Sequence, residues 1–144
     1  MNEAFLLFSG VLIFFILYFL LARGQRKSLI LKNGKKTAVD AEIADNMLLR
    51  AKGMMGRSSL GENQGMLFIF PRPGKYGFWM LGTAIPLEAI CFSEEKTVVD
   101  ILKLEPHSLS VCYPKKPAKY VLEVKNGFSR NNNVKIGRTR IENA

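Results

Sequence analysis

Apolar residues form one long run at the N-terminus of this chain, and short runs separated by polar breakers over the rest of it. The long run, residues 4–22, has about nineteen residues without a charge and is rich in Phe, Leu and Ile. A helix of that length is just long enough for a bilayer core. The pattern therefore predicts a transmembrane anchor over residues 1–22. A cleavable signal peptide is the alternative, but the leading end carries Glu3 and no basic residue, and no small-x-small cleavage site follows.

The next segment has the pattern of a β-hairpin followed by a short helix. Residues 28–32 are a strand candidate, the Asn-Gly pair at 33–34 is a strong two-residue turn, and 35–44 alternate between apolar and polar positions. Asp or Asn at 45–46 can cap a helix over 47–52, which a glycine then ends.

The centre of the chain is a series of short apolar runs that we expect to form buried strands. They cover residues 66–70, 77–80 and 87–92 and contain the only Trp. Residues 97–104 should pair antiparallel with 87–92, and a further strand is expected at 119–125. This spacing predicts a mainly β fold (α+β minor). The architecture is a compact antiparallel β-sandwich or a partly closed barrel with one short helix.

Two further predictions concern a proline-containing loop and the C-terminal segment. Pro71 and Pro73 lack the N–H donor that a central strand needs, so the loop that holds them should lie at an edge or rim. Near the C-terminus, residues 129–133 predict one helical turn, and 138–142 predict a last edge strand or a frayed tail.

The apolar runs and the turns between them carry several short motifs in a fixed order. These are Gly53-Met54-Met55-Gly56-Arg57, Gly65-Met66-Leu67-Phe68-Ile69-Phe70, Phe78-Trp79-Met80 with Thr83, Ile85-Pro86-Leu87-Glu88, and Tyr120-Val121-Leu122-Glu123 with Gly127. Over about residues 41–137 the chain resembles the DUF192 family of small proteins of undefined function. The resemblance implies a compact, mainly antiparallel β domain and no established reaction.

One motif departs from the family pattern. Family members read Trp-Met-Lys-Asn-Thr and then Pro-Leu-Asp, whereas this chain has Leu81 and Gly82 for the Lys and Asn, and Glu88 for the Asp. A cation and an amide are therefore missing from the most diagnostic site, which implies a changed or lost activity. Gly82 would also let a ligand approach the backbone closely.

Four polar residues are candidates for ligand binding: Arg57, Thr83, Glu88 and Glu123. Arg57 has the position of the family's arginine and can grip a carboxylate or phosphate, or form an internal salt bridge to Glu88 or Glu123. Thr83 and Glu88 flank the proline at 85–86, which can turn both toward one cleft. Glu123 interrupts an apolar strand and lies either on a solvated face or next to Arg57.

Trp79 and four methionines are weaker candidates for ligand binding. Trp79 lies in an apolar run and is expected in the core rather than as a stacking platform. Four methionines are expected to fill core gaps, with a soft binding surface as the alternative, namely Met47, Met54, Met55 and Met66.

Catalytic, metal and cofactor signals are weak. Two Cys and one His lack metal-ligand spacing, no glycine loop fits a phosphate, and we expect no cofactor. A Cys91–Cys112 disulfide requires an oxidising compartment. A small hydrolase or transferase with Glu88 or Asp100 as general base is the alternative to a binding protein.

The distribution of charge along the chain predicts its division into segments and its orientation at a membrane. The chain carries +9, and Glu3 is the one charged residue before position 23, so the remainder carries +10. We divide it into the anchor, a basic segment with the first strand at 23–36, and a β domain at 37–144. The basic segment predicts contact with anionic lipid head groups and, by the positive-inside rule, a cytoplasmic domain; exported relatives favour the extracytoplasmic side.

The combined expectation is a membrane-tethered, non-enzymatic binding or accessory module. Its predicted partners are membrane lipid and either a small anionic or polar ligand or a membrane protein. The high positive charge also suits nucleic acid, but we consider that partner less favoured than lipid.

Overall fold

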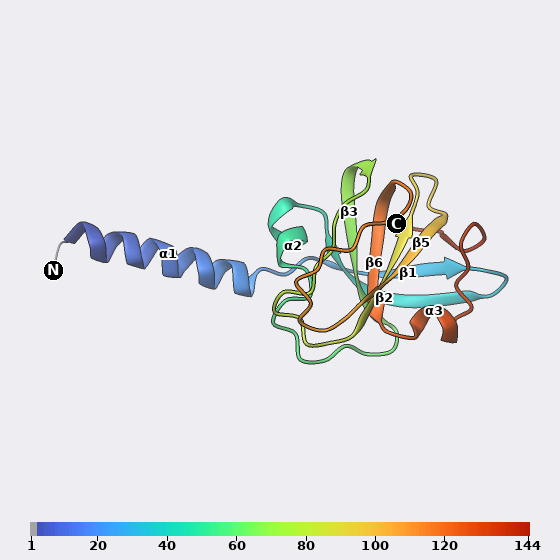
Figure 1. Ribbon diagram of the computed structural model, residues 1–144, viewed down its shortest axis with the longest axis horizontal. Coiled ribbons are helices and arrows are strands. Elements are labelled where there is room, and N and C mark those ends of the chain that lie inside the picture. Colours follow the sequence, from blue (N-terminus) through green and yellow to red (C-terminus); the bar gives the residue numbers. More distant parts are fainter. Residues whose placement is uncertain (1–2) are drawn as a thin grey trace.

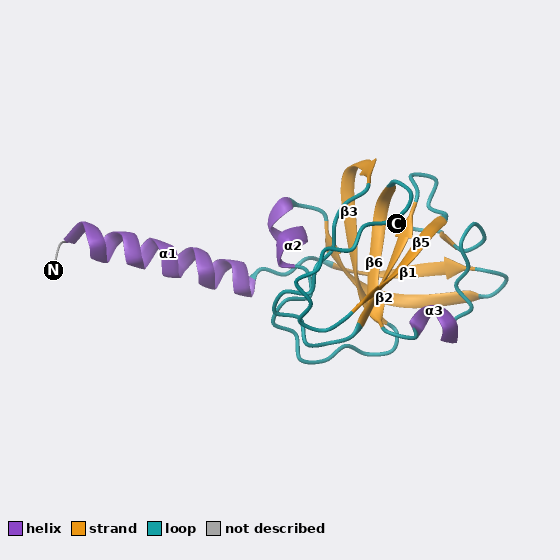
Figure 2. Ribbon diagram, in the orientation of Figure 1, coloured by secondary structure: helices purple, strands orange, loops and turns teal. Residues whose placement is uncertain are grey.

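The computed structural model describes residues 3–144, with side chains from residue 9 onward, and is built on one curled sheet (Figures 1 and 2). The strands are β1 Arg26–Lys32, β2 Lys36–Ala44, β3 Gln64–Gly74, β4 Leu87–Phe92, β5 Val98–Leu104, β6 Ala118–Lys125 and β7 Arg140–Ile141. The helices are α1 Glu3–Leu21, α2 Met47–Lys52 and α3 Phe128–Asn131.

The seven strands have the order β5-β4-β6-β3-β2-β1-β7, and their neighbours are antiparallel except for β2 and β3. The sheet curls so that its two outer strands meet at one end. There the Val98 N–H donates to the Thr139 carbonyl at 2.9 Å, and the Ile141 N–H donates to the Lys96 carbonyl at 3.0 Å. The predicted mainly β fold is confirmed, and the single curled sheet agrees with the partly closed barrel rather than the sandwich.

Alternating side chains divide the buried apolar residues between the two faces of the sheet. One face carries Phe68, Leu87 and Val121 together with Met80, and this cluster lies under α2 and the segment after β3. The other face carries a second cluster, which includes Leu67, Ile90, Phe92, Leu122 and the α3 residue Phe128. Neighbours such as Leu67 and Phe68 thus point to opposite sides, as the two-residue period of a strand requires.

Local turn and cap signals predicted their elements well. β1 and β2 form the expected hairpin, and Asn46 caps α2 by accepting the Leu49 N–H at 3.0 Å. Two predictions differ. Residues 77–80 form no strand and make only a bridge between Phe78 and Cys112. β3 continues through Pro71 and Pro73, because a register shift after Ile69 frees those positions from pairing with β6.

The N-terminal helix α1 extends away from the sheet (Figure 1). Across the described residues, no helix combines the length and the apolar character that crossing a membrane requires. The predicted transmembrane anchor over residues 1–22, whose first two residues lie outside the described part, is therefore wrong, and so is the single-pass membrane localisation. The 19 residues of α1 rise about 28 Å, which is at the lower limit for a hydrocarbon core of roughly 30 Å, and the helix begins at the charged Glu3.

Candidate functional site

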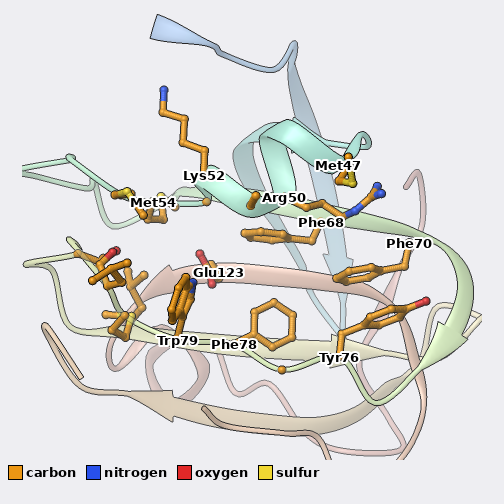
Figure 3. A pocket seen from close by; sticks show the side chains of 18 residues that line it. Met47, Arg50, Lys52, Met54, Phe68, Phe70, Tyr76, Phe78, Trp79 and Glu123 are labelled. Atoms are coloured by element: carbon orange, nitrogen blue, oxygen red, sulfur yellow. The ribbon is translucent and has the colours of Figure 1, made fainter. Parts of the chain in front are cut away.

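A pocket of about 360 Å³ lies between α2 and the sheet (Figure 3). One wall is α2 with residues 53–55, the opposite wall is the segment 76–83, and the sheet supplies Phe68, Phe70, Leu87 and Glu123. Aromatic and methionine side chains dominate this lining, and the charged side chains in it are Arg50, Lys52 and Glu123.

The α2 wall is fixed at both ends of the helix. Asn46 caps its first turn, and Gly53 ends it with a φ of 50°, while the Gly53 N–H donates to the Leu49 carbonyl at 2.9 Å. Leu49 is buried against the sheet, so the helix presents other residues to the pocket.

Lys52 joins this wall to the end of α1. Its Nζ donates to the Leu20 and Ala22 carbonyls at 2.6 Å each, which satisfies acceptors left open by the last turn of α1. Figure 3 shows the side chain pointing away from the pocket. Burial lowers the pKa of Lys52 from its ordinary value.

Aromatic rings form the opposite wall and one end of the pocket. Phe70 and Tyr76 are stacked, with ring centroids 3.7 Å apart, and the Arg50 guanidinium lies 5.5 Å from the centroid of Phe70. Phe78 packs edge-on against Phe68 at 5.7 Å. Trp79 is 48% exposed and lines the pocket, so its predicted place in the core is wrong.

A tight turn holds the segment 80–83 next to α2. Gly82 has a φ of 62°, and its carbonyl accepts the Gly56 N–H at 2.9 Å. Asn, which the family pattern has at this place, also tolerates the left-handed conformation, so the turn does not depend on the departure. Leu81, in place of the family's Lys, is 40% exposed and lines the pocket.

Glu123 is the acidic residue of the pocket lining. It is 4% exposed, and its carboxyl has no hydrogen bond or ion pair with any residue whose side chain is described. Burial raises the pKa of Glu123 to about 8, against an opposing effect of Arg57. The group therefore carries a proton at neutral pH.

Arg57 lies close to this carboxyl but pairs with another one. It forms an ion pair with Glu42 of β2, which is 3% exposed and also accepts the Gly24 N–H at 2.8 Å. Burial opposes ionisation of Glu42, but the Gly24 N–H and Arg57 hold its pKa below the ordinary value. Of the two sequence interpretations, the internal salt bridge agrees with the structure, with Glu42 as partner rather than Glu88 or Glu123.

Glu88 lies away from the pocket. Its two carboxylate oxygens accept the Gly127 N–H at 2.8 Å and the Ser129 N–H at 2.9 Å, at the start of α3. Asp100 is similarly engaged, since it accepts the Ile101 N–H at 2.9 Å and the Lys115 N–H at 2.8 Å. Both carboxylates thus hold backbone N–H groups.

The structure brings two of the four predicted ligand-binding residues to the pocket. These are Thr83 and Glu123; Thr83 is buried, and its hydroxyl lies 3.4 Å from the Leu81 carbonyl. Sequence reasoning missed Arg50 and Tyr76, for which no local motif gave a signal. Met47, Met54 and Met55 line the pocket, as in the soft-surface alternative, although Met54 is also buried.

The cysteines do not form a disulfide. Cys91 is buried in β4 and Cys112 is partly buried, and both thiols are free. Burial raises the pKa of Cys91 to about 12, so this thiol is not a reactive group at neutral pH.

Comparison with known proteins gives the same fold. A crystal structure from Sinorhizobium meliloti, of a protein described provisionally as a transcription regulator, matches with a TM-score of 0.80 and 25% identity, over 84% of this chain and 95% of that one. A protein of unknown function from Novosphingobium aromaticivorans matches with a TM-score of 0.78 and 27% identity, over 83% and 86%.

Two proteins from Pyrococcus species are related to this chain in sequence. A UPF0127 protein of Pyrococcus abyssi is 38% identical over 67% of this chain and 80% of its own length. A UPF0127 protein of Pyrococcus furiosus is 28% identical over 72% and 87%. The family model of DUF192, described as an uncharacterized ACR, matches residues 29–141. The chain therefore belongs to the DUF192 family.

Proposed function

We propose that this protein is a non-enzymatic binding module whose pocket holds a small, mainly apolar molecule. The observation that carries the proposal is Glu123, a buried carboxyl that faces an aromatic pocket and has no hydrogen-bond or ion-pair partner among the side chains of residues 9–144. Ligand sites are typically concave and mostly apolar, with a few polar groups that fix orientation. The pocket has this composition, and its volume of about 360 Å³ is at the small end of the usual range.

An unpaired buried polar group also favours binding on energetic grounds. Leaving such a group without a hydrogen bond costs about 1–3 kcal/mol. A ligand that supplies a partner for Glu123 recovers part of that cost. The aromatic wall around Phe78 and Trp79 adds contact area for a flat or branched molecule.

Trp79 makes the proposal directly testable. It is the only Trp in the chain and lies in the pocket wall, so its fluorescence should change when a ligand enters. We would screen small aromatic and aliphatic compounds for such a change, together with a rise in Tm. Binding that saturates in both measurements supports the proposal.

A matched pair of variants separates the pocket from the rest of the surface. Ala51→Phe adds bulk on the α2 wall and should abolish binding. Leu109→Ala alters an exposed apolar residue outside the pocket lining and should leave binding unchanged. If Ala51→Phe binds as well as the original chain, the pocket is not the site.

One observation favours a second candidate, a small hydrolase or transferase. A carboxyl whose pKa is about 8 is suited to general acid or base catalysis near neutral pH, and Glu123 has that property. Glu88 and Asp100 are less suited, because both already hold backbone N–H groups. Turnover in a screen of esters and amides, abolished by Glu123→Gln, would favour the enzyme over the binding module.

A further inference from the structure

We infer that the pocket selects an uncharged molecule with an aromatic body and one carbonyl oxygen, and that the Glu123 carboxyl donates the hydrogen bond to that oxygen. This inference rests on the proposed function and names its ligand class. Three features carry it, namely the isolation of the carboxyl, the aromatic walls and the placement of the nearby cations.

The isolation of Glu123 makes it a donor. Glu123 is 4% exposed, and the guanidinium that acts on it electrostatically, Arg57, is committed to Glu42. Leu81 places an apolar side chain where the family pattern has Lys, so this wall supplies no cation. An isolated buried charge is costly, so the carboxyl stays neutral, and a neutral carboxylic acid has one O–H to donate.

The walls select the body of the ligand. Glu123 points toward the centre of the pocket in Figure 3, with Trp79, Phe78 and Phe68 around it. Aromatic rings pack well against other rings in offset or edge-on geometries. A ligand ring among these three side chains would have its substituent within reach of the carboxyl.

The cations disfavour charged ligands of either sign. Arg50 lies on the α2 wall beside Phe70, and its positive charge repels an ammonium group, whereas the Lys52 side chain points away from the pocket. Both also donate to backbone carbonyls, Arg50 to Ile69 at 2.8 Å and Lys52 to the end of α1. Neither side chain is directed at the Glu123 carboxyl in Figure 3, so a ligand carboxylate bound there would lack a counter-ion, whereas a neutral carbonyl needs none.

The test compares three probes of similar size on the full chain, at pH 6.5. They are phenylacetamide, 2-phenylethylammonium and ethylbenzene, and binding is followed by Trp79 fluorescence and by NMR. We expect phenylacetamide to bind about tenfold more tightly than either of the others, which is the effect of about one additional hydrogen bond. Tighter binding of the ammonium or of ethylbenzene overturns the inference and leaves the proposed function standing. If none of the three binds, the aromatic pocket is not a ligand site, and both proposals fail.

The pH dependence gives a readout that a purely structural role would not produce. The titratable and charged groups close to Glu123 are Arg57, the Cys91 thiol and, two strands away, Glu42, and the pocket lining adds Arg50, Lys52 and Tyr76. We expect the affinity for phenylacetamide to fall as the pH rises from 7 to 9.5, because an ionised Glu123 cannot donate.

Two variants complete the test. Glu123→Gln keeps an N–H donor and should bind phenylacetamide without that pH dependence. Glu123→Leu should bind phenylacetamide and ethylbenzene equally. A fall in affinity with pH that persists in Glu123→Gln would contradict the assigned role.

Discussion

Glu42 and Glu123 lie in one row across the sheet, on either side of Met66, yet only Glu42 pairs with Arg57. Two strand spacings separate the backbones of the two residues by about 10 Å. The pKa of Glu42 is lowered by its partners, whereas that of Glu123 is raised to about 8 by burial. One face of the sheet thus holds a charged carboxylate and a neutral carboxyl at neutral pH.

The raised pKa of Glu123 predicts that the protein loses stability as the pH rises. Between about pH 4.5 and 8 the unfolded chain has released this proton while the folded chain keeps it, so the free energy of unfolding falls by about 1.4 kcal/mol per pH unit. Compared with Glu123→Gln, the original chain should lose about 2–3 kcal/mol between pH 5.5 and 7.5. Urea unfolding at the two pH values measures this difference. Parallel behaviour of the two proteins would show that Glu123 is ionised in the folded state.

The ion pair between Arg57 and Glu42 is predicted to stabilise the fold. Arg57→Ala leaves a buried carboxylate with the Gly24 N–H as its remaining partner, so we expect a loss of about 2–3 kcal/mol in the free energy of unfolding. Arg26→Ala is the matched control, because Arg26 and Asp40 form an exposed pair worth less than about 1 kcal/mol. Equal losses in the two variants would argue against a special role for the buried pair.

Glu88 is predicted to act on stability and not on ligand binding. Glu88→Ala removes the acceptor of two backbone N–H groups at α3, and we expect the free energy of unfolding to fall by about 2–3 kcal/mol. Glu94→Ala removes an exposed carboxylate and should cost less than about 1 kcal/mol. A pocket ligand should bind the folded Glu88→Ala variant with unchanged affinity. Weaker binding would place Glu88 in the site after all.

The positive φ of Gly82 predicts what happens when the Asn of the family motif replaces this glycine. Gly82→Asn should cost about 1 kcal/mol, since Asn tolerates the positive φ, although its Cβ would lie 2.8 Å from the Met55 Cγ and the Met55 side chain must shift. Gly82→Val should cost at least about 2 kcal/mol, because a β-branched residue is strained there. Thermal unfolding of the two variants gives the comparison, and similar Tm values would contradict the strain argument.

Local signals account for the parts of the fold that the sequence predicted correctly. The Asn-Gly pair at 33–34 fixes the first hairpin, and Asn46 fixes the start of α2, because each acts through its own backbone. The curl of the sheet was harder to predict from the sequence. It depends on hydrogen bonds between residues about forty positions apart, such as Val98 and Thr139, for which no local pattern exists.

Parts of the candidate site also could not be predicted from local sequence patterns. Glu123 was found because it interrupts an apolar strand, but its isolation follows from the partner that Arg57 takes, which depends on the register of β2, β3 and β6. Trp79 was misplaced because an apolar run reads as a buried strand, whereas here the run lines a pocket. An apolar pattern does not distinguish a core from a binding surface.

Both walls of the pocket belong to connections between strands. α2 lies between β2 and β3, and residues 75–86 lie between β3 and β4, while Glu123 belongs to the sheet itself. Connections tolerate substitutions that would break a strand's register. Wall residues can therefore change, as at Leu81 and Gly82, without a change in the register of the sheet.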